Sequence, residues 1–455
     1  MYFKSFVISV LKYVGIDKAI AYSSGTRVIQ AFTGIGSIYF ISTFLTGIEQ
    51  GFYFTFGSLL AIQVFFELGL NNIITQFSAH ENAKIEYDNK LNPIGCNDSI
   101  SRLSSIVHFS FKWYSIIAVL FYIIVTVAGI VFFKNSENTN GVSWLKPWLF
   151  LSLMSSINLF ISPFYAILNG IGYIKQVSKI RFFQQIFIPL SSWIGLVSGF
   201  KLYVLGISLL VMFLVGIYIV LSSEMIIKLR GIWRNRGEKR INYRCEVFPL
   251  QWKMALSWIS GYFIYQLFNP ILFHYAGAEV AGKMGMTMQV LNAIQAFSFS
   301  WMGTKIPRYS TLIAQKRYLE LDKVFSRTLK QLLLITSVVL ITFIFVLTVI
   351  DDIITFPYKI DSKFLSGIAL YAMCFSIISN QTLSSFANYL RCHKKEPLVL
   401  QSVVVSILCA LSSLTCTKYW GVNGMTVGYT FIMTFISLPW IYSIYKRKKY
   451  EWHQI

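Results

Sequence analysis

Apolar runs of about 20 residues recur along the whole chain, and they constrain its fold more than any other feature. A transmembrane helix needs about 20 mostly apolar residues to cross the hydrocarbon core. About twelve such runs can be recognised by their hydropathy. The predicted spans are residues 27–48, 51–79, 108–133, 147–172, 182–199, 202–227, 254–275, 281–305, 328–350, 364–390, 398–417 and 422–445. The sequence therefore predicts an all-α, polytopic membrane protein.

Composition agrees with this assignment. Hydrophobic residues make up 55% of the chain and charged residues only 13%, against about 25% charged residues in soluble domains. The formal net charge of +21 would suggest a nucleic-acid partner in a soluble protein. Here the basic residues lie in short connections between the spans, which is the positive-inside pattern of membrane proteins. Nucleic acid is therefore not expected as a partner.

The basic residues also predict the orientation of the chain. If the N-terminus is cytoplasmic, the even-numbered connections collect most of the lysines and arginines, notably within residues 80–107, 228–253 and 306–327. The opposite connections hold few, and the KRKK run at residues 446–449 follows the last span. Cytoplasmic loops carry this excess of positive charge. A multi-pass topology with both termini in the cytoplasm is predicted.

The chain is expected to consist of two six-helix lobes. Residues 231–252 form a basic connection near the middle, which predicts a cytoplasmic linker between an N-terminal lobe, 1–230, and a C-terminal lobe, 253–455. Binding of this basic segment to lipid headgroups or to a partner is an alternative. A weak internal repeat, residues 47–63 against 277–295, favours two pseudo-symmetric bundles around a central cavity, as in many transporters.

A polar stripe interrupts the second predicted span. Gln63, Glu67, Asn71 and Thr75 follow one another at four-residue steps, so they share one face of a continuous helix. A charged residue at the centre of a membrane costs about 2.5–3.5 kcal/mol on insertion scales, so Glu67 is expected to face the protein interior or water. The stripe either lines a cavity that binds glycan hydroxyls, a proton or a cation, or makes a structural pair with a basic residue of another span.

A comparable strip is expected in the second half. Gln289, Asn292 and Gln295 lie on the predicted span 281–305, and Phe299 stands where the repeat would place a counterpart of Glu67. The carboxylate is therefore not duplicated.

Four basic residues are candidates for substrate phosphate. Arg27 opens the first span, Lys283 lies near the outer end of span 281–305, and Lys305 and Arg308 lie near its inner end. Anchoring at the lipid headgroups is the more common role of such residues. A cation within a cavity that excludes water would instead bind phosphate strongly.

Nothing in the sequence predicts an enzyme. Glycine-rich phosphate loops, nucleophile elbows and metal-protease motifs are not found, and the six cysteines have no zinc or disulfide spacing. No cofactor or metal is therefore expected. His274 is a second candidate for ion coupling, beside Glu67, although a single histidine is more often simply hydrogen-bonded.

Residues 47–70 and 76–81 resemble the second helix of O-antigen flippases of the Wzx type. These belong to the multidrug/oligosaccharidyl-lipid/polysaccharide exporter superfamily, called MOP below. Residues 168–175 and 389–395, at the inner ends of two spans, are also similar to that family. The resemblance implies about twelve helices in two six-helix lobes around a cavity that carries cationic residues, for which Arg27, Lys283, Lys305 and Arg308 are the positional candidates.

The resemblance also implies a function. Such proteins flip undecaprenyl-pyrophosphate-linked oligosaccharide, the O-antigen repeat unit of lipopolysaccharide biosynthesis, from the cytoplasmic to the periplasmic leaflet of the bacterial inner membrane by alternating access. The expected partners are this substrate, membrane lipids, H⁺ or Na⁺ as an optional coupling ion, and other O-antigen assembly proteins. A multidrug exporter of the same fold is one alternative. A membrane-embedded glycan polymerase or ligase is another, although the short outward loops leave little room for its reacting groups.

Overall fold

The computed structural model describes residues 18–135, 141–235, 237, 239, 241–353, 361–393 and 395–453. Each predicted span coincides with helix, which confirms the all-α membrane fold. The elements are α2 (Lys18–Phe44), α3 (Gly47–Leu60), η1 (Ala61–Gln63), α4 (Val64–Glu67), α5 (Leu70–Asn82), β1 (Ile85–Tyr87), β2 (Pro93–Gly95), α6 (Asn97–Lys134), α7 (Leu145–Gly170), α8 (Ile174–Val197), α9 (Tyr203–Leu221), α10 (Met225–Arg234), η2 (Tyr243–Val247), α11 (Phe248–Tyr265), α12 (Phe268–Ala276), α13 (Ala278–Gly303), α14 (Ile306–Ala314), α15 (Tyr318–Ile353), η3 (Asp361–Lys363), α16 (Gly367–Cys392), α17 (Val399–Phe431), η4 (Ile432–Ser437) and α18 (Leu438–His453).

Several of these helices are long and apolar enough to cross a membrane. Within the described ranges six helices meet that condition, and a bent pair, Gly47–Glu67 with Leu70–Asn82, would make a seventh. The other predicted spans fall on helices that are shorter or more polar, such as α12 and α13. The last two predicted spans are joined in one long helical stretch, which is kinked at Gly421, where φ is 58°.

The second predicted span is broken, so the expectation of one continuous helix over residues 51–79 is wrong. The chain takes positive φ at Leu68 (47°) and Gly69 (69°), and the two helical parts meet at an angle of 43°. Gly69 adopts this conformation at little cost because it has no Cβ. The break follows Glu67 directly, which places the carboxylate at a helix end.

Contacts divide the chain into two units. Unit 1 consists of residues 1–33, 63–130 and 145–255, and unit 2 consists of residues 34–62, 131–144 and 256–455. Residues 34–62 and 131–144 are thus grouped with the C-terminal part of the chain. The division into lobes at residues 1–230 and 253–455 stays a prediction.

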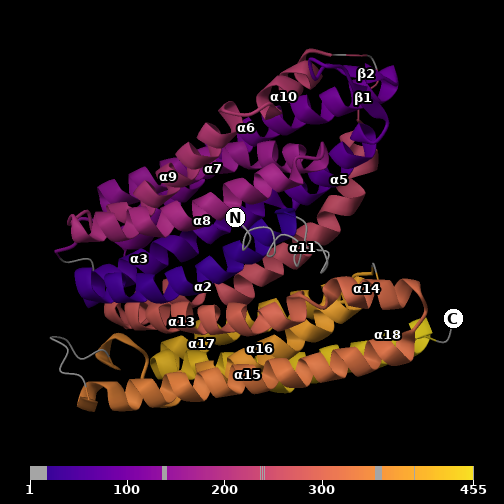
Figure 1. Cartoon of the computed structure of the whole chain (residues 1–455). Coiled ribbons are helices and arrows are strands. Elements are labelled where there is room, and N and C mark those ends of the chain that lie inside the picture. Colours follow the sequence, from indigo (N-terminus) through magenta and orange to yellow (C-terminus); the bar gives the residue numbers. More distant parts are fainter. Residues whose placement is uncertain are drawn as a thin grey trace, which may run out of the picture. The chain divides into compact units, whose positions relative to one another are not determined.

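In unit 1, α7 packs against α5 and α9, and α9 also packs against α8 (Figure 1). Trp148 on α7 is fully buried. Its indole Nε1 donates a hydrogen bond to the carbonyl of Thr126 at 3.3 Å. A Cβ added to Gly129 would lie 2.2 Å from the Trp148 ring, so a glycine is required where α6 passes this side chain.

A short hairpin extends unit 1 between α5 and α6. Strands β1 and β2 pair antiparallel, with Glu86 opposite Ile94. Asp88 closes the turn by accepting hydrogen bonds from the backbone N–H groups of Lys90 and Asn92. The hairpin lies against α10 (Figure 1).

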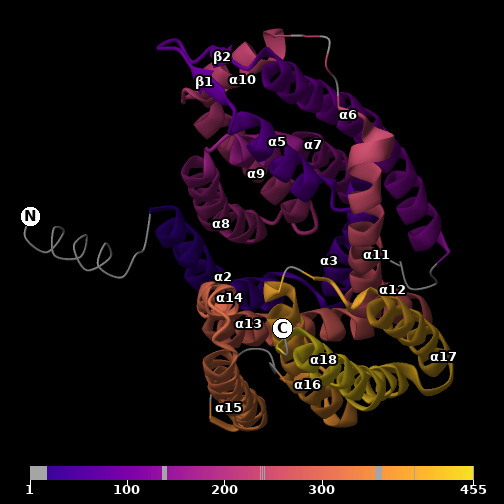
Figure 2. The same ribbon diagram turned by 90° about the vertical axis from the view of Figure 1, so that its right-hand side faces the viewer.

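Unit 2 is built around the close contact of α3 with α13 (Figure 2). These helices begin the two halves of the predicted repeat. A Cβ on Gly51 would lie 2.0 Å from the carbonyl oxygen of Ala278, and one on Gly282 would lie 2.7 Å from that of Gly47. Small residues let two membrane helices approach to backbone contact. The glycines therefore determine this helix pair.

Aromatic side chains and a second group of helices complete unit 2. The ring centroids of Phe52 and Phe133 are 5.2 Å apart, and those of Phe52 and Phe273 are 4.9 Å apart. Farther along the chain, α16 contacts α15, α17 and α18 (Figure 2). Tyr389 of α16 is fully buried.

Substitution of Gly51 by alanine should destabilise unit 2. Overpacking of this kind costs about 1–3 kcal/mol. Gly57 lies on the same helix, and a Cβ there meets no atom within 4 Å, so Gly57→Ala should be neutral or stabilising. Thermal unfolding of each purified variant in detergent measures these two changes in stability. Equal stability of the two variants would contradict the packing of α3 on α13.

Candidate functional site

Glu67 lies at the centre of a hydrogen-bonded cluster in unit 1. The Gln63 Nε2 donates to Glu67 Oε1 at 2.5 Å, and the Asn71 Nδ2 donates to Glu67 Oε2 at 3.3 Å. Although the helix is broken between Glu67 and Asn71, the polar stripe is thus continuous. Both oxygens of the carboxylate accept hydrogen bonds from neutral amide groups.

Side chains of α6 and α7 hold this cluster in place. Asn71 Nδ2 also donates to Ser162 Oγ at 3.1 Å, and the hydroxyl of Tyr114 donates to Asn71 Oδ1 at 3.0 Å. On α7, Ser155 Oγ donates to Gln63 Oε1 at 3.4 Å. Three helical segments therefore fix the orientation of the carboxylate.

The alternative reading of Glu67, an ion pair with a basic residue of another span, is not found among the side chains that the structure describes. A carboxylate whose partners are neutral amides keeps a large part of its desolvation cost when charged. Such a group is suited to accept a proton or to bind a monovalent cation. A role of Glu67 in ion coupling stays a prediction.

Two other candidates, Arg27 and His274, lie on other helices. Arg27 lies in α2, and its side chain is outside the described part of the structure. His274 lies near the end of α12, where its ring makes an edge-to-face contact with Tyr275 at 4.8 Å. The predicted roles of Arg27 in substrate binding and of His274 in ion coupling are left as predictions.

The polar strip on α13 connects helices of unit 2. Gln289 Nε2 donates to the carbonyl of Gly34 at 3.4 Å, and the carbonyl of Gln295 accepts from Gln381 Nε2 at 2.9 Å. Asn292 is exposed. Of the three residues, Asn292 thus presents a free amide face for a ligand to contact.

Lys283 forms an ion pair on its own helix. Its Nζ lies 3.2 Å from Glu279 Oε1, one helical turn earlier. Lys283 and Lys305 are separated by about 30 Å along the helix at 1.5 Å per residue. They therefore cannot bind the same phosphate group, and each is a separate candidate.

A hollow in unit 2 brings Lys305 and Arg308 together with a third cation. It has a volume of 660 Å³ and lies where the end of α13, the start of α14 and α15 meet. Its lining consists of Ser300, Trp301, Thr304, Lys305, Arg308, Val324, Arg327, Thr328 and Gln331. The lining thus carries three positive charges and no carboxylate. We call it the cationic hollow.

The three cations differ in their partners. Arg308 Nη2 binds Glu320 Oε1 at 2.9 Å, and Arg317 binds the same carboxylate. For Lys305 and Arg327, no carboxylate lies within ion-pair distance in the described ranges. These two charges are consequently available to an anion, and charge-assisted hydrogen bonds to phosphate are among the strongest in proteins.

Arg327 was not among the residues predicted from the sequence. It belongs to the basic connection before span 328–350, where a charge is normally solvated. The available signal was its spacing: Arg327 precedes Gln331 by four residues, so both lie on one face of α15. Trp301, which is 42% exposed, adds an aromatic surface on which a sugar ring can stack.

Comparison with known proteins shows the fold. No family model matches the chain, and no curated protein matches its sequence. Among solved structures it is similar to a multidrug resistance MATE family transporter of the MOP superfamily in an inward-facing conformation, with 12% identity, a TM-score of 0.55, and coverage of 92% of this chain and 98% of that one.

Two further structures agree. A mutant of the Vibrio cholerae MATE transporter VcmN is 12% identical with a TM-score of 0.57, covering 96% of this chain and 98% of that one. A MATE protein in complex with MaL6 is 11% identical with a TM-score of 0.51, covering 96% and 97%. The chain therefore has the fold of MOP-superfamily transporters, over nearly its whole length.

Proposed function

We propose that the protein is a flippase that moves undecaprenyl-pyrophosphate-linked oligosaccharide from the cytoplasmic to the periplasmic leaflet of a bacterial inner membrane. The MOP fold supports transport. The cationic hollow favours a substrate that carries phosphate, because Lys305 and Arg327 offer positive charge without a neutralising carboxylate. The resemblance of residues 47–70 to O-antigen flippases supports the same choice.

The position of the hollow suits the loading of a headgroup. The predicted topology places the end of α13 and the start of α15 on the cytoplasmic side, where the substrate would enter. A hydrated glycan and a pyrophosphate cannot cross hydrocarbon unaided, because unpaired polar groups are costly there. A polar route lets the headgroup pass while the polyprenyl tail stays among the lipids.

The membrane potential can contribute to the driving force. About 2.3 kcal/mol per 100 mV is gained for each elementary charge that crosses down the field. Two negative charges moving outward therefore gain about 4.6 kcal/mol per 100 mV. We expect H⁺ or Na⁺ to be exchanged only if Glu67 or His274 takes part in the cycle.

A multidrug exporter is the second candidate, and the similarity to MATE transporters favours it. Cationic drugs would be attracted by carboxylates, and Glu67 is a candidate for such a contact in unit 1. The cationic hollow would repel them. The similarity to transporters also supports transport over a membrane-embedded glycan polymerase or ligase.

Deletion of the gene separates the two candidates. Loss of the proposed flippase should leave lipid-linked repeat units on the cytoplasmic leaflet and abolish surface glycan, without changing drug susceptibility. Surface glycan that persists in a strain with no other flippase, together with increased drug susceptibility, would replace the proposed function by multidrug export.

Removal of the free cations should impair flipping. Lys305→Ala and Arg327→Ala are each expected to lower the rate of surface glycan appearance about tenfold, since a hydrogen bond to a charged group contributes about 1.5–3 kcal/mol. Lys330→Ala is the matched control, because this exposed residue lies on the same helix and outside the hollow. Equal effects at Lys305, Arg327 and Lys330 would exclude the hollow as a substrate site.

Glu67→Gln should reduce transport while the amount of protein in the membrane is unchanged. Glutamine keeps the shape and one of the two acceptor oxygens, so it can still accept from Gln63 or from Asn71, but it can no longer exchange a proton or bind a cation as a carboxylate does. Glu86→Gln on the exposed hairpin is the control. Loss of transport and of protein together, measured by immunoblot, would show instead that Glu67 is structural.

A further inference from the structure

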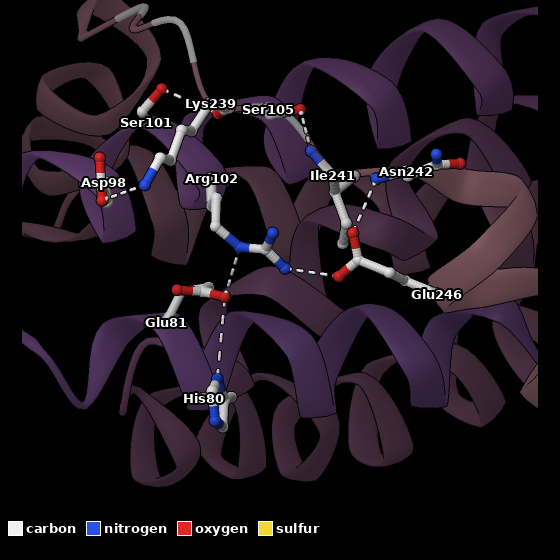
Figure 3. Close-up of polar contacts among 10 residues, drawn as sticks. All are labelled: His80, Glu81, Asp98, Ser101, Arg102, Ser105, Lys239, Ile241, Asn242 and Glu246. Atoms are coloured by element: carbon white, nitrogen blue, oxygen red, sulfur yellow. Dashed lines mark hydrogen bonds and ion pairs between the residues drawn. The ribbon is translucent and has the colours of Figure 1, made fainter.

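The central connection of the chain is fastened to unit 1 by a charged cluster (Figure 3). Arg102, near the start of α6, lies between two carboxylates. Its Nε donates to Glu81 Oε1 at 2.9 Å, and its Nη2 donates to Glu246 Oε2 at 2.5 Å. Glu81 lies at the end of α5, whereas Glu246 lies in η2, directly before α11. The Arg102 guanidinium thus joins α6 to a segment that lies 144 residues farther along the chain.

The same cluster holds the backbone of the connection. Ser101 Oγ donates to the carbonyl of Lys239 at 2.9 Å, and the N–H of Ile241 donates to Ser105 Oγ at 3.2 Å (Figure 3). Lys239 Nζ also pairs with Asp98 Oδ2 at 2.5 Å. The connection is therefore bound along the start of α6 at Lys239, Ile241 and Glu246. We call these contacts the linker clasp.

Burial makes the central ion pair costly to break. The Glu81 side chain is only 5% exposed, and those of Arg102 and Glu246 are 28% and 32% exposed. Removing one partner of a buried pair leaves an uncompensated charge in a poorly solvated place. Arg102 and the N–H of Asn242 also hold the pKa of the Glu246 carboxyl below its usual range. The stability that the charged Glu246 carboxylate contributes is present at neutral pH. It is lost only as the pH falls through the lowered pKa of this group.

The clasp changes which part of the chain can act as a joint. The connection at residues 231–252 was predicted to be a linker between lobes, yet it is bound to unit 1, and unit 1 continues to Ala255 within α11. Beyond that point lies Gly261, where an added Cβ would meet no atom within 4 Å. Farther on, the helix is interrupted between Tyr265, where α11 ends, and Phe268, where α12 begins. These are features at which a helix can bend.

We propose that the linker clasp keeps the central connection docked on unit 1 throughout transport, so that, along this connection, movement between the units is absorbed beyond Ala255 and not in the linker. This inference rests on the proposed function only in that transport is its second readout. A docked connection transmits the displacement of unit 1 directly to α11. A loose connection would absorb the displacement instead.

Trypsin cleavage of the linker and transport together test the proposal. Lys239 is a trypsin site in the docked segment, and a protease needs extended, accessible chain. In inside-out vesicles, Arg102→Ala should raise the rate of cleavage there about tenfold and lower surface glycan formation in cells. Glu246→Gln retains the pair of Arg102 with Glu81 and should show a smaller change in the same direction. This milder variant tests the proposal even if Arg102→Ala does not fold.

Arg447→Ala is the matched control, because Arg447 pairs with Glu451 on the exposed end of α18. It should change neither cleavage nor transport. Cleavage that is equally fast in the unmodified protein and in Arg102→Ala would show that the connection is not docked. Faster cleavage with unchanged transport would show that docking has no part in the cycle. The cleavage result does not depend on the substrate, so it stands apart from failure of the proposed function.

Discussion

The structure depends on one constraint, which is that hydrocarbon offers no hydrogen-bond partner to a polar group. Helices satisfy the backbone within themselves, and the polar side chains around Glu67 bind one another. Glu67 binds Gln63 and Asn71, and Asn71 in turn binds Ser162 and Tyr114. The break after Glu67 is accompanied by a contact of Thr75 Oγ1 with the carbonyl of Ala166 on α7 at 3.0 Å. Beyond this departure from regular helix, a neighbouring helix thus supplies a polar partner.

The same constraint explains which parts of the fold could be predicted from the sequence. A run of about 20 apolar residues in this environment has to be helical, so the predicted spans coincide with helices. The break at Leu68 and Gly69 could not be predicted in the same way, because a glycine between leucines has the same apolar character as the rest of the span. Only the positive φ of both residues reveals it.

Contacts between segments that are far apart in the sequence could not be predicted for a different reason. Arg327 joins Lys305 only because α15 returns along α13, and Arg102 joins Glu246 only because the linker lies along α6. A charge in a cytoplasmic connection is normally solvated, and its sequence neighbours do not show otherwise. The stripe at Gln63, Glu67 and Asn71 was predictable because its members lie at four-residue steps. Contacts between distant segments carry no such local signal.

The two candidate sites differ in the sign of their charge. Unit 1 contains Glu67 among neutral partners, whereas in unit 2 the repeat places Phe299 at the corresponding position and the cationic hollow supplies Lys305 and Arg327. An exchange of one inward cation at Glu67 for a doubly negative headgroup moving outward would transfer three charges down the field. At about 2.3 kcal/mol per charge, this gains about 6.9 kcal/mol per 100 mV. If the proposed roles hold, separate sites of opposite sign would let both ions use the same potential without neutralising one another, which a single mixed site could not do.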